Sequence, residues 1–380
     1  MKKRILSAIL ALTMLIPIGF LNISAEEPFT IDAKSGILME ASTGKVLFEQ
    51  NADEALPPAS VTKIMTLLLV MEAVDNGTLK LTDMIRTSTN ASSMGGSQIY
   101  LKEGEELSAE DMIKSVVISS ANDAAVALAE HIAGSEEVFV KMMNDKAAEL
   151  GMNNTVFENT NGLDDTAQNH VTSARDIALM SAELIKHTKI LEYSSIWMDS
   201  IRDGAFGLTN TNRLIRFYKG ANGLKTGSTS KAGFCISATA ERDGMTLIAV
   251  VMGSPTRDVR NAEATKMLDW GFANYAVYKC EAETMGSIKV LGGTVDICSI
   301  AHSEFSAVIS AAEKGKITLL PEISESISAP VKAGDKVGII KVLSGENEIG
   351  TIDVICENDV KKIGFWGVLG QMLTYFCLMQ

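Results

Sequence analysis

Three short polar clusters in this chain contain residue types that together could catalyse acyl transfer. In chain order they are Ser60-x-x-Lys63, Ser120-Ala121-Asn122 and Lys225-Thr226-Gly227. They supply a hydroxyl nucleophile, an amine to deprotonate it, a second hydroxyl to relay the proton, and a cation that could hold a substrate carboxylate. The set contains no histidine. It therefore predicts a serine nucleophile that is activated by a lysine.

The Ser-x-x-Lys spacing is weak evidence by itself, because residues 42–45 and 228–231 match it as well. Ser60 differs from these in its context: it precedes an almost wholly apolar stretch, Val61–Val74, which we expect to form a buried helix. Residues three apart lie on the same face of a helix, so Lys63 should lie beside Ser60. Burial favours the neutral form of an amine. We therefore expect Lys63 to be the base for Ser60, rather than a lysine that extends to the surface.

The second cluster also has a duplicate, since Ser88-Thr89-Asn90 has the same pattern. Either copy could be a helix cap or a turn. The later copy falls between two predicted helices, where a connection could project its side chains into a cleft. There we expect Ser120 to relay a proton to the leaving amine, and Asn122 to contact the substrate through its amide.

The third cluster lies on a predicted strand at the edge of a sheet, where an exposed lysine can simply protect against aggregation. Together with the other clusters it indicates more. Lys225 and Thr226 could hold a carboxylate, and Gly227 would leave room for a substrate backbone. The backbone N–H of Ser228 could pair with that of Ser60 as an oxyanion hole.

The elements that must position these clusters are predicted to form an α+β fold. Helices in the middle of the chain separate two strands near the start from three strands later on, which indicates one antiparallel sheet covered by helices, with a helical subdomain. The expected strands are 37–40, 46–49, 223–229, 234–240 and 246–253, and the expected helices are 61–74, 111–119, 123–132, 136–150, 173–186 and 260–275.

The two ends of the chain differ from this central part. Residues 1–25 have the basic start, apolar run and small-residue end of a signal peptide; a retained N-terminal helix is the alternative. Residues 279–359 contain short segments in which apolar and polar residues alternate, a pattern typical of a small all-β domain. Residues 360–380 end in an uncharged stretch, whose glycines gather on one side at helical spacing. We expect this stretch to be an amphipathic membrane anchor; packing on the protein's own core is the alternative.

Composition excludes several classes of function. The formal net charge of −13 argues against a nucleic-acid partner, because binding the phosphate backbone requires clustered lysine and arginine. The five cysteines are widely spaced, contain no C-x-x-C pair, and are expected to be mostly buried apolar residues, although one bridge is possible. A conventional serine triad lacks its G-x-S-x-G motif, and the metalloprotease motif H-E-x-x-H is absent.

Taken together, the ordered clusters, the signal segment, the β-rich C-terminal domain and the terminal helix resemble the low-molecular-mass penicillin-binding proteins, specifically the D-alanyl-D-alanine carboxypeptidases. Pro57-Pro58-Ala59 before the serine and Asn222-Gly223-Leu224 before the lysine add to the resemblance. It implies a β-lactamase/transpeptidase-like domain over residues 26–278, followed by the β domain and the anchor.

The resemblance also implies an activity. Such enzymes remove the terminal D-alanine from peptidoglycan pentapeptides outside the cytoplasmic membrane, through an acyl-enzyme that would form on Ser60; β-lactams mimic the substrate. Arg260 matches a family arginine near the substrate carboxylate. No metal or organic cofactor is implied. Position 228 departs from the family pattern, because this chain has a serine where bulkier residues are common. This difference could alter side-chain contacts with the substrate.

Two other functions remain open at this point. A serine β-lactamase needs a further carboxylate to activate water, and Glu158, Asp164 and Asp165 are the candidates, although none stands in that class's usual local pattern. A non-catalytic envelope protein that binds muropeptides or β-lactams is the second alternative.

Overall fold

The computed structural model describes residues 29–163 and 167–378. Every helix and strand given below belongs to the unit Ile31–Gln380. The predicted signal segment, residues 1–25, lies outside the described residues, as do Asp164 and Asp165.

The catalytic clusters are organised around a five-stranded antiparallel sheet, as the sequence predicts. Its strand order is β2-β1-β9-β8-β7, so the two N-terminal strands join three strands from much later in the chain. The central strands β8 and β9 are buried along most of their length, which explains their nearly continuous apolar sequence. The strands are β1 (Ser35–Glu40), β2 (Val46–Gln50), β7 (Ala221–Thr229), β8 (Gly233–Arg242) and β9 (Met245–Ser254).

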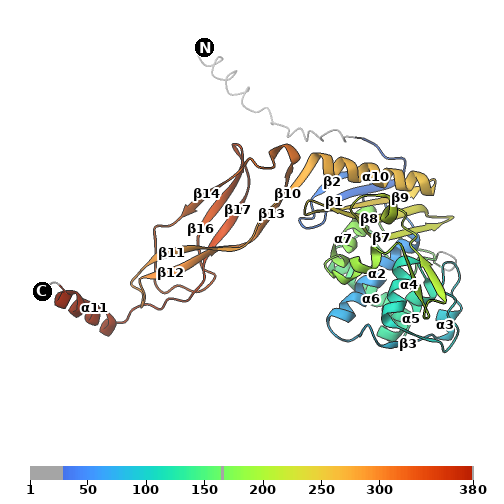
Figure 1. Ribbon diagram of the computed structural model, residues 1–380. Helices are drawn as coiled ribbons and strands as arrows, with labels where there is room; N and C mark the ends of the chain where they lie inside the picture. Colours follow the sequence, from blue (N-terminus) through green and yellow to red (C-terminus); the bar gives the residue numbers. More distant parts are fainter. Residues whose placement is uncertain (1–28, 164–166, 379–380) are drawn as a thin grey trace, which may run out of the picture. The chain divides into compact units, whose positions relative to one another are not determined.

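Helices cover both faces of this sheet (Figure 1). Helix α10 (Arg257–Asn274) lies on one face, where Gly271 lets it approach closely: a Cβ at this position would lie 2.6 Å from Leu247. Helix α7 (Ala174–Leu184) packs against β1 and β9 on the other face, with α2 (Lys63–Asp75) behind it. Helix α2 is apolar on all sides because it forms the centre of the core between α7 and the helical subdomain.

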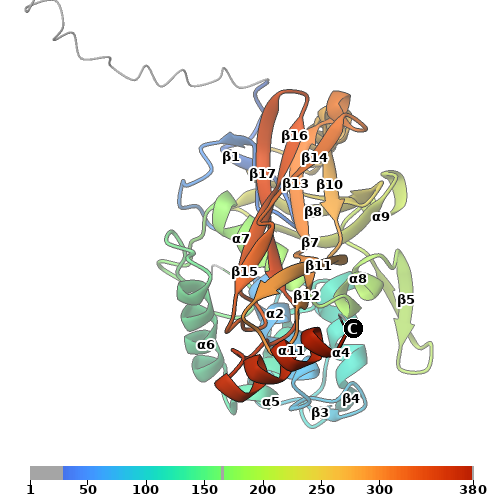
Figure 2. The same ribbon diagram turned by 90° about the vertical axis from the view of Figure 1, so that its left-hand side faces the viewer.

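The helical subdomain and its short strands surround the other side of α2 (Figure 2). Side-chain caps begin several of these helices; Ser108, for example, accepts a hydrogen bond from the backbone N–H of Asp111 at the start of α4. The remaining elements are α3 (Thr89–Ser92), α4 (Ala109–Ile118), α5 (Asn122–Ala133), α6 (Glu136–Glu149), α8 (Lys189–Ser194), α9 (Leu214–Phe217), β3 (Met84–Arg86), β4 (Glu106–Ser108), β5 (Met198–Ile201) and β6 (Phe206–Thr209). The hairpin of β5 and β6 was not predicted, because each strand has only four residues.

The helix after Ser60 begins later than predicted. Ser60 lies in a short 3-10 turn, η1 (Ala59–Thr62), and α2 begins at Lys63. Ala59 has a positive φ of 50°, and its carbonyl accepts a hydrogen bond from the Thr62 hydroxyl at 2.8 Å. The turn is therefore held by a side chain and a strained residue, which a hydrophobicity pattern does not reveal.

The C-terminal part of the chain forms an all-β domain, as predicted. Its six-stranded sheet has the order β14-β16-β17-β12-β11-β15, and β10 and β13 form a separate antiparallel pair. A small apolar core of its own includes Val342, Val354 and Cys356. Its elements are β10 (Tyr275–Cys280), β11 (Glu283–Leu291), β12 (Ile297–His302), β13 (Phe305–Ser310), η2 (Ala311–Glu313), β14 (Ile317–Ile323), β15 (Ser326–Ser328), β16 (Lys336–Ser344) and β17 (Asn347–Cys356).

The chain ends in helix α11 (Phe365–Leu378), which leaves large apolar side chains exposed, among them Phe365 and Trp366. Among the helices of the described residues, none is long and apolar enough to cross a membrane. The cysteines described with their side chains are free thiols: Cys235, Cys298 and Cys356 are buried, as predicted, and Cys280 is half-buried.

Candidate active site

The structure places Lys63 directly beside Ser60. The Lys63 Nζ lies 3.0 Å from the Ser60 Oγ, one turn along the chain, as the spacing predicts. The same Nζ lies 2.5 Å from the Oδ1 of Asn122 and 2.8 Å from the backbone carbonyl oxygen of Asn161. The Lys63 side chain is completely buried, so these three groups account for its polar contacts.

These contacts suit a neutral amine. An uncharged lysine has two N–H groups and one lone pair. The Asn122 Oδ1 and the Asn161 carbonyl oxygen can only accept hydrogen bonds, so they take both N–H groups. The lone pair then remains for the third neighbour, the hydroxyl of Ser60, which can donate. The amine is thereby oriented to remove the hydroxyl proton.

Electrostatics favour the same protonation state. Burial, followed by the charge of Lys225, holds the pKa of Lys63 well below its usual value, and the carboxylate of Asp123 opposes this shift. A lysine that is uncharged near neutral pH can act as a general base, whereas an ammonium cannot.

Ser120 and Asn122 lie in and just after the connection between α4 and α5. Ser120 adopts a positive φ of 64°, uncommon for a residue other than glycine, and its neighbour Asn122 donates its backbone N–H to the Ser97 carbonyl at 2.7 Å. Asn122 also donates its side-chain amide to the Gly95 carbonyl at 2.7 Å. Asn122, predicted to contact substrate, is thus buried with both ends of its amide engaged within the protein, and it orients Lys63. The duplicate at residues 88–90 is a helix cap: the Ser88 hydroxyl accepts from the backbone N–H of Ala91.

Strand β7 forms the opposite wall and lies at the edge of the sheet, as predicted. Gly227 is needed there, because a Cβ would lie 2.8 Å from the backbone nitrogen of Ser60. Thr226 donates its hydroxyl to that of Thr211 at 2.9 Å. The side chain of Lys225, however, is buried rather than exposed, so it does not protect an exposed edge. Its Nζ donates to the carbonyl oxygen of Thr226 at 3.0 Å.

The cations behind β7 repel one another. Burial, and then the charge of Arg260, lowers the pKa of Lys225 to about 7. Arg260 is also buried, and its pKa falls to about 10, because of burial and the nearby Arg257. The guanidinium of Arg260 donates to the Asn261 Oδ1 at 2.8 and 3.1 Å, and Nη1 lies 3.4 Å from the Cys235 carbonyl. Such a group of like charges favours binding of an anion.

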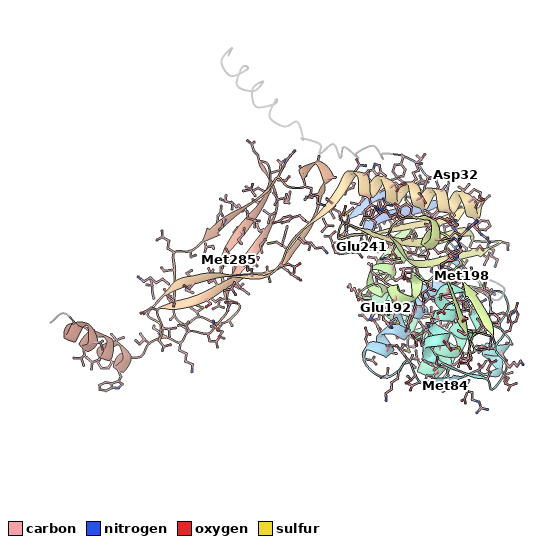
Figure 3. The ribbon with its side chains drawn as sticks, in the orientation of Figure 1. Asp32, Met84, Glu192, Met198, Glu241 and Met285 are labelled. Carbon is pink, nitrogen blue, oxygen red and sulfur yellow. The ribbon has the colours of Figure 1, made fainter. Side chains whose placement is uncertain are left out.

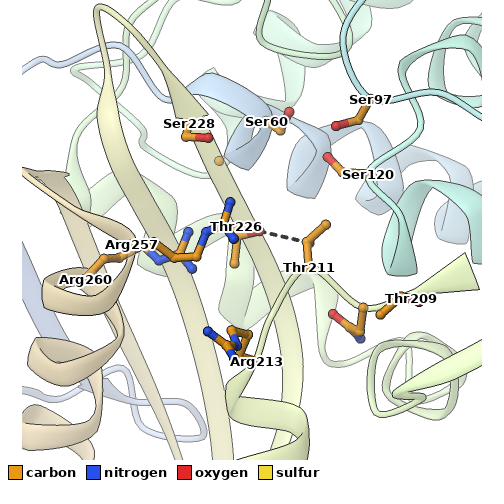
Figure 4. Close-up of a pocket in the computed structure, with 12 residues that line it drawn as sticks. Ser60, Ser97, Ser120, Thr209, Thr211, Arg213, Thr226, Ser228, Arg257 and Arg260 are labelled. Carbon is orange, nitrogen blue, oxygen red and sulfur yellow. Dashed lines mark hydrogen bonds between the residues drawn. The ribbon is translucent and has the colours of Figure 1, made fainter.

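A cavity of about 310 Å³ lies between the two walls (Figure 4). Six of the nine predicted site residues line this cavity. The other three, Lys63, Asn122 and Lys225, lie behind its surface. No carboxylate is among the described residues that line it, which are Ser60, Ser97, Ser120, Thr209, Asn210, Thr211, Arg213, Thr226, Gly227, Ser228, Arg257 and Arg260.

Several of these residues were not predicted. Tertiary contacts alone bring Ser97, Thr209, Asn210, Thr211 and Arg213 to the cavity, and no motif marks them. The carbonyl of Asn161 also has no signal in the sequence, because a backbone atom can belong to any residue type. Arg257 could have been suspected, since it lies one helical turn before Arg260.

Comparison with known protein families agrees with this geometry. Residues 22–256 match the Peptidase S11 family model, described as D-alanyl-D-alanine carboxypeptidase. The chain belongs to this family. Residues 272–362 match a second model, the C-terminal domain of penicillin-binding protein 5.

Individual relatives match most of the chain or its larger part. The chain is 42% identical over 376 residues to the D-alanyl-D-alanine carboxypeptidase DacF of Bacillus subtilis, covering 96% of each protein. The solved structure of penicillin-binding protein 5 from Haemophilus influenzae is 31% identical, with a TM-score of 0.78, covering 88% of this chain and 99% of that one. Penicillin-binding protein D2 from Listeria monocytogenes, solved with ampicillin bound, is 34% identical with a TM-score of 0.59 and covers 64% of this chain and 99% of that one. The chain is therefore a serine peptidase of the D-alanyl-D-alanine carboxypeptidase type.

Proposed function

We propose that this carboxypeptidase releases the terminal D-alanine of peptidoglycan pentapeptides through an acyl-enzyme on Ser60. The observation that carries the proposal is the position of the Lys63 amine, 3.0 Å from the Ser60 hydroxyl and held there by two acceptors. Lys63 removes the hydroxyl proton as the Ser60 Oγ attacks the peptide carbonyl. Ser120, which faces the same cavity, passes its proton to the departing amine of D-alanine and receives one from the protonated Lys63, and water then hydrolyses the ester.

The remaining residues bind the substrate in this proposal. The backbone N–H groups of Ser60 and Ser228 stabilise the oxyanion, and Gly227 keeps the approach to them open. The terminal carboxylate binds at the side of the cavity that carries Thr226 and Arg260, with Lys225 adding positive charge behind the strand. Asn122 contributes by orienting Lys63 rather than by direct contact with substrate.

A single experiment tests the activity. The enzyme is incubated with a peptide that ends in D-Ala-D-Ala and, separately, with a labelled penicillin. Released D-alanine together with a persistent label on Ser60 supports the proposal. Rapid turnover of the penicillin would instead indicate a β-lactamase, and neither reaction would indicate a binding protein. The absence of a carboxylate among the described cavity residues favours the first outcome, because a β-lactamase needs one to activate water.

We further propose that β-lactams bind this cavity covalently. Related proteins support this, since penicillin-binding protein D2 of Listeria monocytogenes has been solved with ampicillin and with cefotaxime. Acylation of Ser60 by a penicillin would open the lactam ring and leave the ester on Oγ, the same bond that the peptide substrate forms.

The cellular setting is an extracytoplasmic one in this proposal, with residues 1–25 as a signal peptide and α11 as an anchor on the outer face of the membrane. Support for the anchor comes from the exposure of its large side chains, 75% for Phe365 and 80% for Trp366. Aromatic residues of this kind favour the membrane interface.

Deletion of residues 363–380 tests the anchor. We expect the signal-processed, truncated enzyme to appear in the soluble fraction with its peptidase activity intact, and not to sediment with vesicles, because the exposed apolar side chains are gone. The full-length enzyme sedimented with the same vesicles is the control. Retention of the truncated form on membranes would place the anchor elsewhere.

A further inference from the structure

A second hollow, with exposed aromatic side chains, lies beside the active site. Its volume is about 680 Å³, and it is bounded by the loop from Ile99 to Glu105 and by the β5–β6 hairpin. Two aromatic residues, Tyr100 and Phe206, stand among charged ones. We call this hollow the aromatic groove; its lining residues are Ile99, Tyr100, Lys102, Glu103, Gly104, Glu105, Arg202 and Phe206.

The ring of Tyr100 is held outward by its backbone. Tyr100 has a positive φ of 57°, and its side chain is 67% exposed. The backbone N–H groups on either side, of Ile99 and Leu101, both donate to the buried carboxylate of Asp123 at 3.0 to 3.2 Å. A bulky residue in this conformation is uncommon and persists only where surrounding contacts impose it. The loop therefore presents an aromatic ring to solvent from a fixed position.

The hairpin wall is equally well fixed. Arg202 donates to the Glu105 carboxylate at 2.7 Å and to the Ile99 carbonyl at 2.9 Å, which joins the hairpin to the loop. Its guanidinium lies 5.3 Å from the centre of the Phe206 ring. The rings of Phe206 and Tyr100 meet edge to face, with centres 6.3 Å apart. Other parts of this hairpin are apolar and exposed too, such as Met198 on β5 (Figure 3).

Two segments of the chain lead from the catalytic cavity to the aromatic groove. Ser97 and Thr209 line the catalytic cavity, and Figure 4 shows them on the side away from Arg257 and Arg260. From Ser97 the chain runs three residues to Tyr100, and from Thr209 strand β6 runs three residues back to Phe206. Along β6 these three residues span about 10 Å, and three residues of any chain cannot span more than about 11 Å. The groove therefore lies within a few residues of the cavity, toward the side away from Arg257 and Arg260.

This placement fixes which part of the substrate can reach the groove. The terminal carboxylate of the substrate binds near the arginines under the proposed function, so the acyl part extends the other way. The carbonyl that Ser60 attacks belongs to the fourth residue of a pentapeptide, and the three residues before it span about 10 Å when extended. The group beyond them is the amino-sugar to which the peptide is attached.

We propose that the aromatic groove binds this amino-sugar of the peptidoglycan strand. The inference rests on the proposed function and adds a part of the substrate that the catalytic clusters do not contact. A sugar ring has an apolar C–H face and a polar rim. Tyr100 and Phe206 supply apolar surface for the face, and Lys102 and Glu103, both exposed, supply hydrogen-bonding groups for the rim.

The test compares two substrates that share the same pentapeptide, one free and one carrying its disaccharide. D-Alanine release is measured for the full enzyme and for Tyr100→Asn, because asparagine tolerates a positive φ while removing the ring. Phe206→Leu is a second variant that keeps an apolar side chain. Phe217→Leu is the matched control: Phe217 is 68% exposed on α9 and lies outside the described lining of the groove.

We expect the unmodified enzyme to have the higher kcat/KM for the disaccharide-bearing peptide. Each groove variant should lower that value by about threefold to tenfold more than the value for the free peptide, as expected for loss of one aromatic contact. Equal losses on both substrates in folded variants, or no preference in the unmodified enzyme, would overturn the proposal. If no D-alanine were released from either substrate, the proposed function itself would fail.

Discussion

The two walls of the catalytic cavity both carry a buried lysine, yet they treat it differently. On the wall formed by η1 and α2, Lys63 is surrounded by oxygen atoms that orient its nitrogen toward Ser60. On the wall formed by β7, Lys225 donates a hydrogen bond to the carbonyl oxygen of Thr226 and lies near the positive charge of Arg260.

In the proposed mechanism this difference separates a base from a binding charge. Burial and the charge of Lys225 hold the pKa of Lys63 well below its usual value, which favours the neutral form, whose lone pair can be aimed at a proton. Lys225 has a pKa of about 7, so a large fraction of it is charged and a bound carboxylate would raise that fraction. We therefore expect the same residue type to serve two roles, because one site supplies acceptors and the other supplies a second cation.

The largest effect is expected from Lys63→Met, which keeps most of the bulk and removes the base. We expect penicillin acylation of Ser60 to slow by about a hundredfold to ten-thousandfold, the usual contribution of a general base. Stopped-flow labelling measures this rate. Lys45→Met, in the exposed Ser-x-x-Lys at the β1–β2 turn, is the control and should acylate normally. Near-normal labelling of Lys63→Met would remove the distinction between the two walls.

A smaller effect is expected from Lys225→Met, which removes a binding charge. We expect kcat/KM for a D-Ala-D-Ala peptide to fall by about tenfold to a hundredfold, mostly through KM, because one charge-assisted hydrogen bond is lost. Lys219→Met, an exposed lysine nearby in sequence, is the control. A loss confined to kcat would mean that Lys225 takes part in proton transfer instead.

The pH dependence sharpens the same contrast. As pH rises through about 7, Lys225 of the free enzyme loses its proton, so its attraction for a carboxylate weakens and KM should rise. The pKa of Lys63 is held well below its usual value, which favours its neutral form, so we expect the acylation rate to change less than KM over this range. Steady-state kinetics from pH 6 to 9 measure both quantities. A KM that stays flat in the unmodified enzyme, or that still rises in Lys225→Met, would contradict this assignment.

The smallest effect is expected at the turn that holds Ser60. Glu158 donates its backbone N–H to the Nδ1 of His170, so the proton lies on Nε2, which is 2.8 Å from the Thr62 hydroxyl. Thr62 in turn donates to the Ala59 carbonyl at 2.8 Å. Thr62→Val removes both of these buried hydrogen bonds, so we expect the free energy of unfolding to fall by about 1–3 kcal/mol.

The same substitution should slow acylation by about tenfold, because Ser60 is less firmly placed. Thr62→Ser keeps the hydroxyl and should restore both stability, measured by urea unfolding, and the acylation rate. If Thr62→Val were destabilised but acylated at the normal rate, the turn would support the fold without positioning the nucleophile.

Much of the site could be predicted because local spacing determines it. Ser60 and Lys63 meet since they are one turn apart, and Lys225, Thr226 and Gly227 share a strand whose edge position was expected. The role of Asn122 was predicted less well: its sequence context did not reveal that Gly95 and Lys63 occupy its amide. The carbonyl of Asn161 could not be predicted at all, because the side chain says nothing about where a backbone oxygen will point.

The sequence by itself determined the α+β class, the β-rich C-terminal domain and the chemistry of the three clusters, because periodicity and residue type act over short distances. Tertiary structure alone decided which polar atoms surround each lysine, and thus which amine is a base. It also decided that Tyr100 and Phe206, more than a hundred residues apart in sequence, meet beside the active site. Burial and charge depend on atoms from distant segments, and no local pattern records them.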